Sequence, residues 1–578
     1  MNRPRSLLFS LGLLLAGLSA CGGGESVSVL LDPEVRLLRQ DLPVPVSLPA
    51  ALTVAPRWGR QGWVPDIPPC VPAGPARRDA ASPATLGGTI ELQLDPGQRT
   101  LGGRADLTIQ AGNQPLDRLV FTLSAAAVDG VACDGGPCGG QFSHSDGTLT
   151  VPLDPVLPAG EQLPLTIIWN DAGIEQIWDD FPEGGGPILA NLLDSPSSYF
   201  TFGYIFYPRL RGEGGNPILE FSVTFPGQRT VLMSGELLHE LDNGNGTTTS
   251  TWQVDCRPGR AVALVLGNYD RITGSCAGST LELYYLPGSS IDGYPIVAET
   301  YRPIMQALCS QYQERFGTVP VPVVRLAGVD DRFRNGYSAP GLIIVPNYTF
   351  DDDGSGSFIE RDFFLAHELS HQWWGNAVTV AAAGDIWLIE GMADYIAASA
   401  LERSRSADDG RYIWLWEARP LIDLWKQGGS DHPLVPPAGT SMDPRVYYIK
   451  GAWVLRMLED VIGGDTLDEL LLELATQFRT QPLGTTEFTS RAGTAAGRDM
   501  DWFFEQWLSG SGCLALVEEH RLKGDTLELT VTQDRPWSSA PERFYRAPLT
   551  VRLGYQQRST DRSGEITGPE TVLQLELP

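Results

Sequence analysis

The chain has 578 residues, of which 42% are hydrophobic, and its formal net charge at pH 7 is −28. This length predicts three or four domains rather than a single core. The excess of acidic residues disfavours nucleic-acid binding, because a surface that binds phosphates has to be basic.

Residues 1–20 are typical of a secretory signal peptide, because two arginines precede an apolar run from Leu7 to Leu15 that small residues follow. The run is shorter than the ~20 residues of a membrane-spanning helix. It ends in Leu18-Ser19-Ala20-Cys21, which resembles a bacterial lipobox. We therefore expect an exported bacterial lipoprotein that is anchored in a membrane through Cys21, at the outer membrane or cell surface. Simple secretion with another cleavage site is the alternative.

The next segments differ in composition. Residues 21–85 are rich in Pro and Gly and predict a tether. Residues 86–275 predict a β-rich domain, because apolar residues alternate in Thr89 to Leu94, in Arg104 to Ile109 and in Leu219 to Phe225.

An exported chain can form disulfides, and seven cysteines remain beside Cys21. The expected bridges are Cys133 with Cys138 and Cys256 with Cys276. The partners of Cys70, Cys309 and Cys513 stay open, since connectivity cannot be deduced from sequence.

Residues 276–513 begin with a mixed α/β stretch and continue with helical periodicity. They contain His367-Glu368-Leu369-Ser370-His371. On a helix, histidines four residues apart share one face, and neutral imidazole nitrogens are good zinc ligands. The pentapeptide therefore predicts one zinc ion held by His367 and His371, with Glu368 beside them as the general base of a hydrolase.

A catalytic zinc needs a third protein ligand and an open position. Glu390 is the candidate, because it follows His371 after 18 intervening residues in a segment with a helical pattern. Asp394 lies one turn further along. We expect Asp394 to accept a hydrogen bond from a zinc-binding histidine and so to fix its tautomer. A solvated helix carboxylate is the alternative for each acid.

These motifs together resemble the aminopeptidase N family of zinc gluzincin metallopeptidases, which includes leukotriene hydrolase. The resemblance rests on the zinc motif followed by Gln372-Trp373-Trp374-Gly375-Asn376, on Trp387-Leu388-Ile389-Glu390-Gly391 and on Tyr448-Ile449-Lys450-Gly451. It implies a multidomain α+β fold, in which an N-terminal β-rich domain precedes a thermolysin-like α/β catalytic domain with the zinc helix. It also implies that Tyr448 is the catalytic tyrosine, for which Tyr447 is the neighbouring competitor.

The expected reaction is hydrolysis of peptide bonds by a metal-activated water. Zinc lowers the pKa of water and polarises the scissile carbonyl, while Glu368 moves the proton to the leaving amine. The neutral phenol of Tyr448 donates a hydrogen bond to the oxyanion. Peptides are therefore the expected substrates.

One element of the family pattern differs in this chain. The family carries Gly-x-Met-Glu-Asn, whose glutamate binds the free amine of the substrate. The register of Gly341 and Leu342 aligns Ser338 with that glutamate. A hydroxyl cannot form the charge-assisted pair that a carboxylate forms with an ammonium. The sequence therefore does not predict strict aminopeptidase specificity, and the choice between aminopeptidase and endopeptidase activity stays open. Asp330 and Asp331 lie close enough in sequence to replace the glutamate, but an exposed acidic turn is the favoured interpretation of these two residues.

Two further expectations concern substrate binding and the C-terminus. Ser338, Gly341 and Leu342 are the expected substrate-binding residues, with an extended substrate joining Leu342 to Val345 as an extra strand. Residues 514–578 predict a small β module, because Leu527 to Val531 alternates between apolar and polar residues.

The alternative to a peptidase is a peptide-binding lipoprotein that keeps this fold but does not turn over its ligand.

Overall fold

The computed structural model describes residues 8–11, 81–134, 138–178, 188–194, 197–201, 204–256, 262–288, 293–352, 359–426, 432–437, 439–479, 481–512, 514, 516–523, 526–533, 543–555 and 558–576. The predicted lipid-bearing Cys21 and tether up to residue 80 lie outside these ranges, as do Cys70 and Cys513. The chain divides into two compact units. We call the described residues of 58–383 and 471–484 the β-rich unit, and those of 1–57, 384–470 and 485–578 the helical unit.

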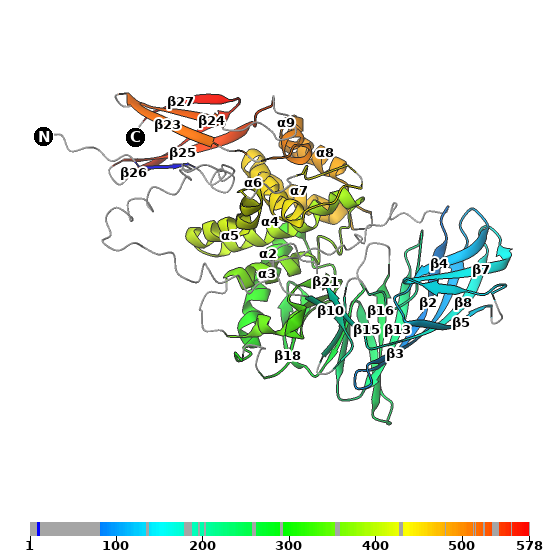
Figure 1. Cartoon of the computed structure of the whole chain (residues 1–578). Helices are drawn as coiled ribbons and strands as arrows, with labels where there is room; N and C mark the ends of the chain where they lie inside the picture. The colour runs from blue at the N-terminus through cyan, green and yellow to red at the C-terminus, as the bar shows by residue number, and fades with distance from the viewer. Residues whose placement is uncertain are drawn as a thin grey trace. The chain divides into compact units, whose positions relative to one another are not determined.

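The β-rich unit begins with three sheets (Figure 1). The seven-stranded sheet has the order β15 (Glu236–Asp242), β16 (Thr247–Asp255), β13 (Ile218–Pro226), β2 (Ala84–Asp95), β3 (Thr100–Gln110), β8 (Gln162–Ala172) and β5 (Ala127–Cys133). The four-stranded sheet has the order β12 (Arg209–Leu210), β4 (Leu116–Thr122), β7 (Thr148–Leu157) and β6 (Ser143–Ser145). The third sheet has the order β14 (Thr230–Met233), β17 (Leu264–Gly267), β11 (Ser197–Phe200), β10 (Ile188–Leu192) and β9 (Glu175–Trp178).

Alternation of apolar and polar residues explains these sheets. In β13 the buried residues are Leu219, Phe221, Val223 and Phe225, with more exposed positions between them. They join Phe121 and the four-stranded sheet in one hydrophobic core. The strands predicted near residues 89–94, 104–109 and 219–225 are confirmed as parts of β2, β3 and β13.

A fourth sheet in this unit contains the strands that lie beside the zinc motif. Its order is β18 (Asp270–Cys276), β19 (Ser279–Tyr285), β20 (Val323–Val329), β22 (Leu342–Pro346) and β21 (Tyr337–Ala339). Two helices belong to the same unit, α2 (Tyr301–Phe316) and α3 (Ile359–Ser370), and short helical turns are η2 (Ala298–Thr300), η3 (Asp331–Phe333) and η4 (Asn347–Phe350). The expectation that a substrate joins Leu342 to Val345 is wrong, because β22 is paired on both edges, with β20 and β21.

The disulfides confirm one expectation and correct another. Cys133 is bonded to Cys138, as predicted. Cys276 is bonded to Cys309, so the expected bridge between Cys256 and Cys276 is wrong. The reason is that Cys276 at the end of β18 lies against α2, which carries Cys309 with a Cα–Cα distance of 5.1 Å. Cys256 is a buried free thiol.

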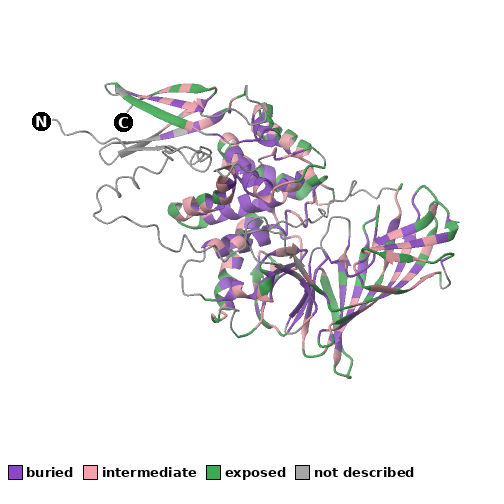
Figure 2. Cartoon of the chain, in the orientation of Figure 1, coloured by how far each residue is buried: buried purple, intermediate pink, exposed green. Residues whose placement is uncertain are grey.

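The helical unit contains η5 (Ala383–Leu388), α4 (Glu390–Ser404), α5 (Ala407–Lys426), the π-helical turn η6 (Val446–Lys450), α6 (Gly451–Ile462), α8 (Thr485–Ala496), α9 (Asp501–Phe504) and the π-helical turn η7 (Glu505–Ser509). Helix α7 (Gly464–Gln477) belongs to both units. Every residue of α4 from Glu390 to Leu401 is buried, and Figure 2 shows this core in purple. Among the described residues, no helix has the length and apolar character that crossing a membrane requires.

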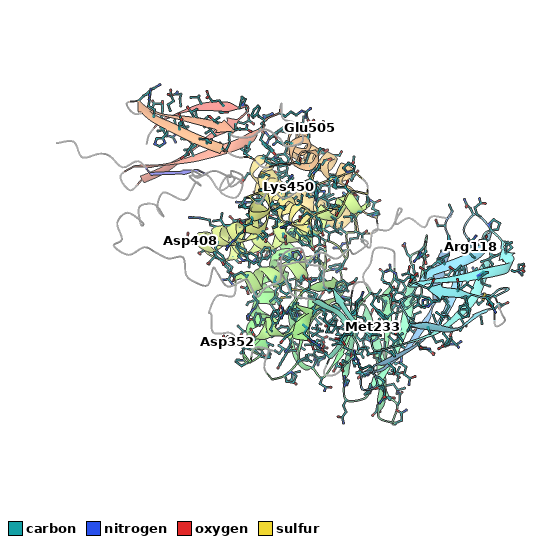
Figure 3. All side chains as sticks on the ribbon, viewed as in Figure 1. Arg118, Met233, Asp352, Asp408, Lys450 and Glu505 are labelled. Atoms are coloured by element: carbon teal, nitrogen blue, oxygen red, sulfur yellow. A yellow bond between two sulfur atoms is a disulfide. The ribbon has the colours of Figure 1, made fainter. Side chains whose placement is uncertain are left out.

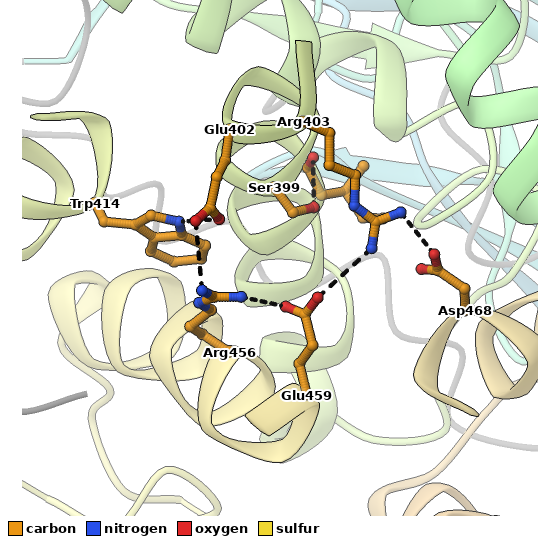
Figure 4. A network of polar contacts seen from close by, with 8 residues as sticks. Ser399, Glu402, Arg403, Trp414, Arg456, Glu459 and Asp468 are labelled. Carbon is orange, nitrogen blue, oxygen red and sulfur yellow. Dashed lines mark hydrogen bonds and ion pairs between the residues drawn. The ribbon is translucent and has the colours of Figure 1, made fainter. Parts of the chain in front are cut away.

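An ionic network holds four helices of this region together, as Figure 4 shows. Arg403 of α4 contacts Asp468 of α7 at 2.6 Å and Glu459 of α6 at 3.5 Å. Arg456 of α6 contacts Glu459 at 2.7 Å and Glu402 at 3.4 Å. The Trp414 indole of α5 also donates to Glu402. The network thus joins α4 to α5, α6 and α7 through paired charges at partly exposed positions.

The C-terminal strands form the predicted β module, and one strand from the N-terminal segment joins it. One three-stranded sheet has the order β23 (Leu516–Lys523), β24 (Thr526–Gln533) and β27 (Glu570–Glu576). The other has the order β1 (Leu8–Leu11), β25 (Ala547–Tyr555) and β26 (Arg558–Ile566). The fold class is confirmed, whereas the five predicted domain ranges stay predictions.

Candidate active site

Helix α3 carries the first histidine and is held by aromatic packing. The hydroxyl of the buried Tyr312 in α2 donates to the Ala366 carbonyl at 2.9 Å. After the helix, the Trp373 indole donates to the Gly317 carbonyl at 3.2 Å. The rings of Tyr312, Phe316 and Trp373 meet edge to face or tilted. These contacts fix α3 against α2.

The two histidines face each other although α3 ends one residue before the second. The helix tightens after Ser370, where the Gln372 N–H donates to the Leu369 carbonyl, so His371 lies in a turn. His371 Nδ1 is 2.9 Å from the Trp374 carbonyl, which makes Nδ1 the donor and leaves the lone pair on Nε2. Its Nε2 is 3.0 Å from His367 Nε2. Two nitrogens on one tetrahedral zinc lie about 3.3 Å apart, so this spacing fits a shared metal.

Glu390, the first residue of α4, completes a possible ligand set. Ligand atoms of His367, His371 and Glu390 all lie within 4.8 Å of one another, and the three side chains are buried. Two neutral imidazoles and one carboxylate form a donor set that zinc prefers in catalytic sites. Asp394 is fully buried one turn further along α4, and its predicted bond to a histidine stays a prediction.

Glu368 is 6% exposed and has a close main-chain neighbour. Gly336, which precedes β21, lies so near that an added Cβ would fall 1.9 Å from Glu368 Oε1. Only glycine leaves this space for the carboxylate. The backbone at Gly336 therefore limits where the Glu368 side chain can lie.

Tyr448 lies in the π-helical turn η6 and donates a hydrogen bond to Glu390. Burial and, next, the negative charge of Glu390 raise the pKa of Tyr448 well above its ordinary value of 10. Its ring lies 5.1 Å from that of Tyr447, and each residue is 8% exposed. The contact with Glu390 distinguishes Tyr448 from its neighbour.

Two glycines bring Glu390 and Tyr448 together. A Cβ on Gly391 would fall 2.8 Å from both the Gly451 Cα and the Tyr447 carbonyl oxygen. The backbones of α4 and of the η6–α6 junction thus touch directly. Lys450, labelled in Figure 3, is buried there and donates to the Gly510 carbonyl at 3.1 Å.

Two amides that sequence reasoning did not assign hold the β21–β22 hairpin. Gln372 accepts from the Gly341 N–H at 2.8 Å and donates to Ser338 Oγ at 2.8 Å and to the Ala339 carbonyl at 3.1 Å. Asn376 donates to the Ser338 carbonyl at 3.2 Å. The sequence signal that could have identified these two amides is their position directly after the zinc motif. Gly341 and Leu342 are buried in this hairpin, whereas Ser338 is half-buried.

The acidic residues considered as substitutes for an amine-binding glutamate have partners of their own. Asp330 accepts from the Arg332 side chain at 2.9 and 3.0 Å and from the Arg332 N–H. Asp331 accepts from the Tyr348 N–H at 2.7 Å. Both carboxylates thus stabilise the turn around η3.

One protein-family model matches part of the chain. Residues 359–507 match the model of the peptidase family M1 domain. A probable aminopeptidase 1 of Sulfurisphaera tokodaii is 22% identical over 306 residues, which are 51% of this chain and 38% of that protein. Pig glutamyl aminopeptidase is 26% identical over 273 residues, 45% of this chain and 28% of the relative. The chain thus spans about a third of the length of the curated relatives that it matches.

Solved structures share the fold. An M1 zinc metallopeptidase from Deinococcus radiodurans has a TM-score of 0.58 at 22% identity, covering 74% of this chain and 94% of that one. Legionella pneumophila aminopeptidase A, solved with aspartic acid, has a TM-score of 0.65 at 15% identity, covering 86% of this chain and 57% of that one. The predicted resemblance to the aminopeptidase N family is confirmed.

Proposed function

Because residues 359–507 match the model of the peptidase family M1 domain, we propose that this chain is a zinc-dependent peptidase. The observation that carries the proposal is the approach of three buried ligands, His367, His371 and Glu390, with their ligand atoms within 4.8 Å. Zinc bound there would act as a Lewis acid on the scissile carbonyl and would make water more acidic.

The chain's own residues supply the proton transfers and charge stabilisation. Glu368 follows His367 directly and serves as the base that takes a proton from the attacking water and passes it to the leaving amine. The Tyr448 phenol, kept neutral by its raised pKa, donates a hydrogen bond to the oxyanion. Asp394 adds negative charge near Tyr448 and orients a ligand histidine.

The edge strand β21 is the proposed substrate platform. It pairs with β22 on one side, and within the described residues no strand covers its other edge. An extended peptide can add to such an edge through main-chain hydrogen bonds, which need no free terminus. Gly336 and Ser338 then lie beside the substrate. This replaces the interior strand β22, which the sequence favoured.

Export and anchoring are part of the proposal. The lipobox-like segment ending at Cys21 predicts a bacterial lipoprotein, and the disulfides Cys133–Cys138 and Cys276–Cys309 suit an oxidising compartment. Fractionation of cells that express the wild type and Cys21→Ser tests it. Wild-type protein should stay with membranes and the variant should not; equal distribution would exclude the anchor.

The test of the activity combines metal analysis with mass spectrometry of peptide products. Purified protein should hold about one zinc per chain. Glu368→Gln should keep the metal and lose roughly 10²–10⁴-fold in kcat. An unchanged product profile in this variant would mean that the chain is not the proposed peptidase. The position of the first bond that is cut shows whether the enzyme removes residues from the peptide's N-terminus or cleaves inside the peptide.

A further inference from the structure

We propose that Ser338 selects substrates whose nitrogen before the cleaved bond is acylated, as in internal or N-blocked peptides, rather than substrates with a free amine. This inference rests on the proposed peptidase function and names its substrate class. The observation behind it is the direction in which the Ser338 hydroxyl can donate.

The orientation of the Gln372 amide is fixed by the backbone. Its Oε1 faces the Gly341 N–H at 2.8 Å, and its Nε2 faces the Ala339 carbonyl at 3.1 Å. Exchanging oxygen and nitrogen would place two donors, and two acceptors, opposite each other. The second Nε2 hydrogen therefore points to Ser338 Oγ at 2.8 Å. Gln372 is fully buried, so these bonds do not compete with water.

Asn376 supplies a second donor at the same hydroxyl. Its Nδ2 lies 3.2 Å from the Ser338 carbonyl, which requires a donor, and 3.4 Å from Ser338 Oγ. The nearer contact fixes the amide orientation, and the longer one places a second N–H beside the hydroxyl oxygen. Asn376 is 4% exposed. Within the protein, the contacts of Ser338 Oγ are thus with N–H donors of Gln372 and Asn376.

A serine hydroxyl has one hydrogen and two lone pairs. Since Gln372 and Asn376 approach the lone pairs, the hydrogen has to point elsewhere. No described residue accepts it. Ser338 is half-buried, so part of the residue remains open to a ligand, and we infer that the hydroxyl hydrogen is directed there. The position thus offers a hydrogen-bond donor and recognises an acceptor.

The location of Ser338 relates this donor to the cleaved bond. A Cβ atom added to Gly336 would point at the Glu368 carboxylate. Residues two apart in an extended segment share a face and lie about 7 Å apart. Ser338 Oγ also accepts a hydrogen bond from Gln372, the residue directly after His371. The hydroxyl is therefore within about two residues of Glu368 along a bound peptide.

The chemistry of the two substrate classes differs at this point. An acylated nitrogen carries a carbonyl oxygen, which accepts the Ser338 hydrogen. An ammonium carries only donors and meets a hydroxyl whose lone pairs are already engaged. A carboxylate at this position would instead attract the ammonium through a charge-assisted bond. Ser338 thus favours a substrate that presents the carbonyl oxygen of an acylated nitrogen, and it offers no acceptor to the positive charge of a free ammonium.

The test uses one peptide sequence with a free or an acetylated N-terminus, and measures kcat/KM for each. The wild type should cleave the acetylated peptide at least as well as the free one. Ser338→Ala should lower kcat/KM about three- to tenfold on the acetylated peptide alone. Ser338→Thr, which keeps the hydroxyl, should restore it. Ser338→Glu should raise the preference for the free amine about tenfold or more.

Ser275→Ala is the matched control, because Ser275 lies on β18, the opposite edge strand of the same sheet. It should leave both rates unchanged. Wild-type preference for the free amine, with the same ratio in Ser338→Ala, would overturn the role of Ser338 while the peptidase function stands. Cleavage of neither peptide by zinc-loaded wild type would overturn both.

Discussion

The backbone of Gly336 touches the carboxylate of Glu368, and no side-chain atom fits between them. Gly336→Ala should therefore displace Glu368 and lower kcat by roughly 10²-fold, since a shift of about 1 Å has this effect on a catalytic group. Zinc content and thermal unfolding should change little. Gly568→Ala is the control, because its added Cβ has no neighbour within 4 Å. Full activity of Gly336→Ala would show that Glu368 tolerates displacement.

The adjacent tyrosines permit a paired substitution. Tyr448 bonds to Glu390, and Tyr447 is equally buried beside it. Tyr448→Phe should lower kcat by roughly 10²–10³-fold with a small change in KM, because the hydroxyl stabilises charge that develops during the reaction. Tyr447→Phe should stay within a few-fold of the wild type. Steady-state kinetics with one peptide decides between the two, and the reverse ranking would assign the role to Tyr447.

Contact between Gly391 and Gly451 predicts a combined loss of stability and activity. Gly391→Ala should lower the free energy of unfolding by about 1–3 kcal/mol, because the methyl group forces the two backbones apart. The separation also moves Tyr448 from Glu390, so kcat should fall. Gly493→Ala in α8 is the matched helix control, as its nearest contact would be 3.8 Å away. It should be neutral or stabilising by up to about 1 kcal/mol.

The lowered pKa of Asp330 predicts that its contribution to stability depends on pH. Burial alone would raise its pKa, but hydrogen bonds from Arg332 lower it below the ordinary 3.8. Stability from this carboxylate is therefore present above pH 3.8 and lost as the pH falls through the folded-state pKa. Asp330→Asn, which can still cap η3, should cost roughly 1 kcal/mol at pH 7 and progressively less in acid. Urea unfolding of this variant and of Arg332→Gln measures the effect, and a cost that grows in acid would contradict it.

The thiol of Cys256 should be unreactive in the native protein. Burial raises its pKa to about 12, and alkylation needs the thiolate. Peptide mapping after iodoacetamide treatment at pH 8 should find Cys256 labelled only after unfolding. The same map should recover Cys276 joined to Cys309. Native labelling of Cys256 would show that this site opens.

Sequence reasoning predicted the parts of the site that follow a fixed spacing. His367, His371 and Glu390 were identified because metal ligands need particular residue types at particular intervals, and their ligand atoms do converge. Strands β2, β3 and β13 of the seven-stranded sheet were recognisable because their apolar residues alternate. Both signals are local in the chain.

Long-range pairings were not predictable in the same way. Strand β21 has three residues, too few for an alternating pattern, so β22 seemed available as an edge. Cys309 lies in a helix, and nothing in its spacing indicated the contact with Cys276. The role of Gln372 depends on backbone groups of residues 339 and 341, which only the folded hairpin brings near.

The π-helical turn Val446–Lys450 has a consequence for the direction of the Tyr448 side chain. A π-helical turn holds one residue more than an α-helical turn, and each residue rotates a helix by about 100°. Deleting one residue here would leave the packing face of α6 intact and turn Tyr448 away from Glu390. The direction of the phenol thus depends on the number of residues in this turn as much as on the identity of Tyr448.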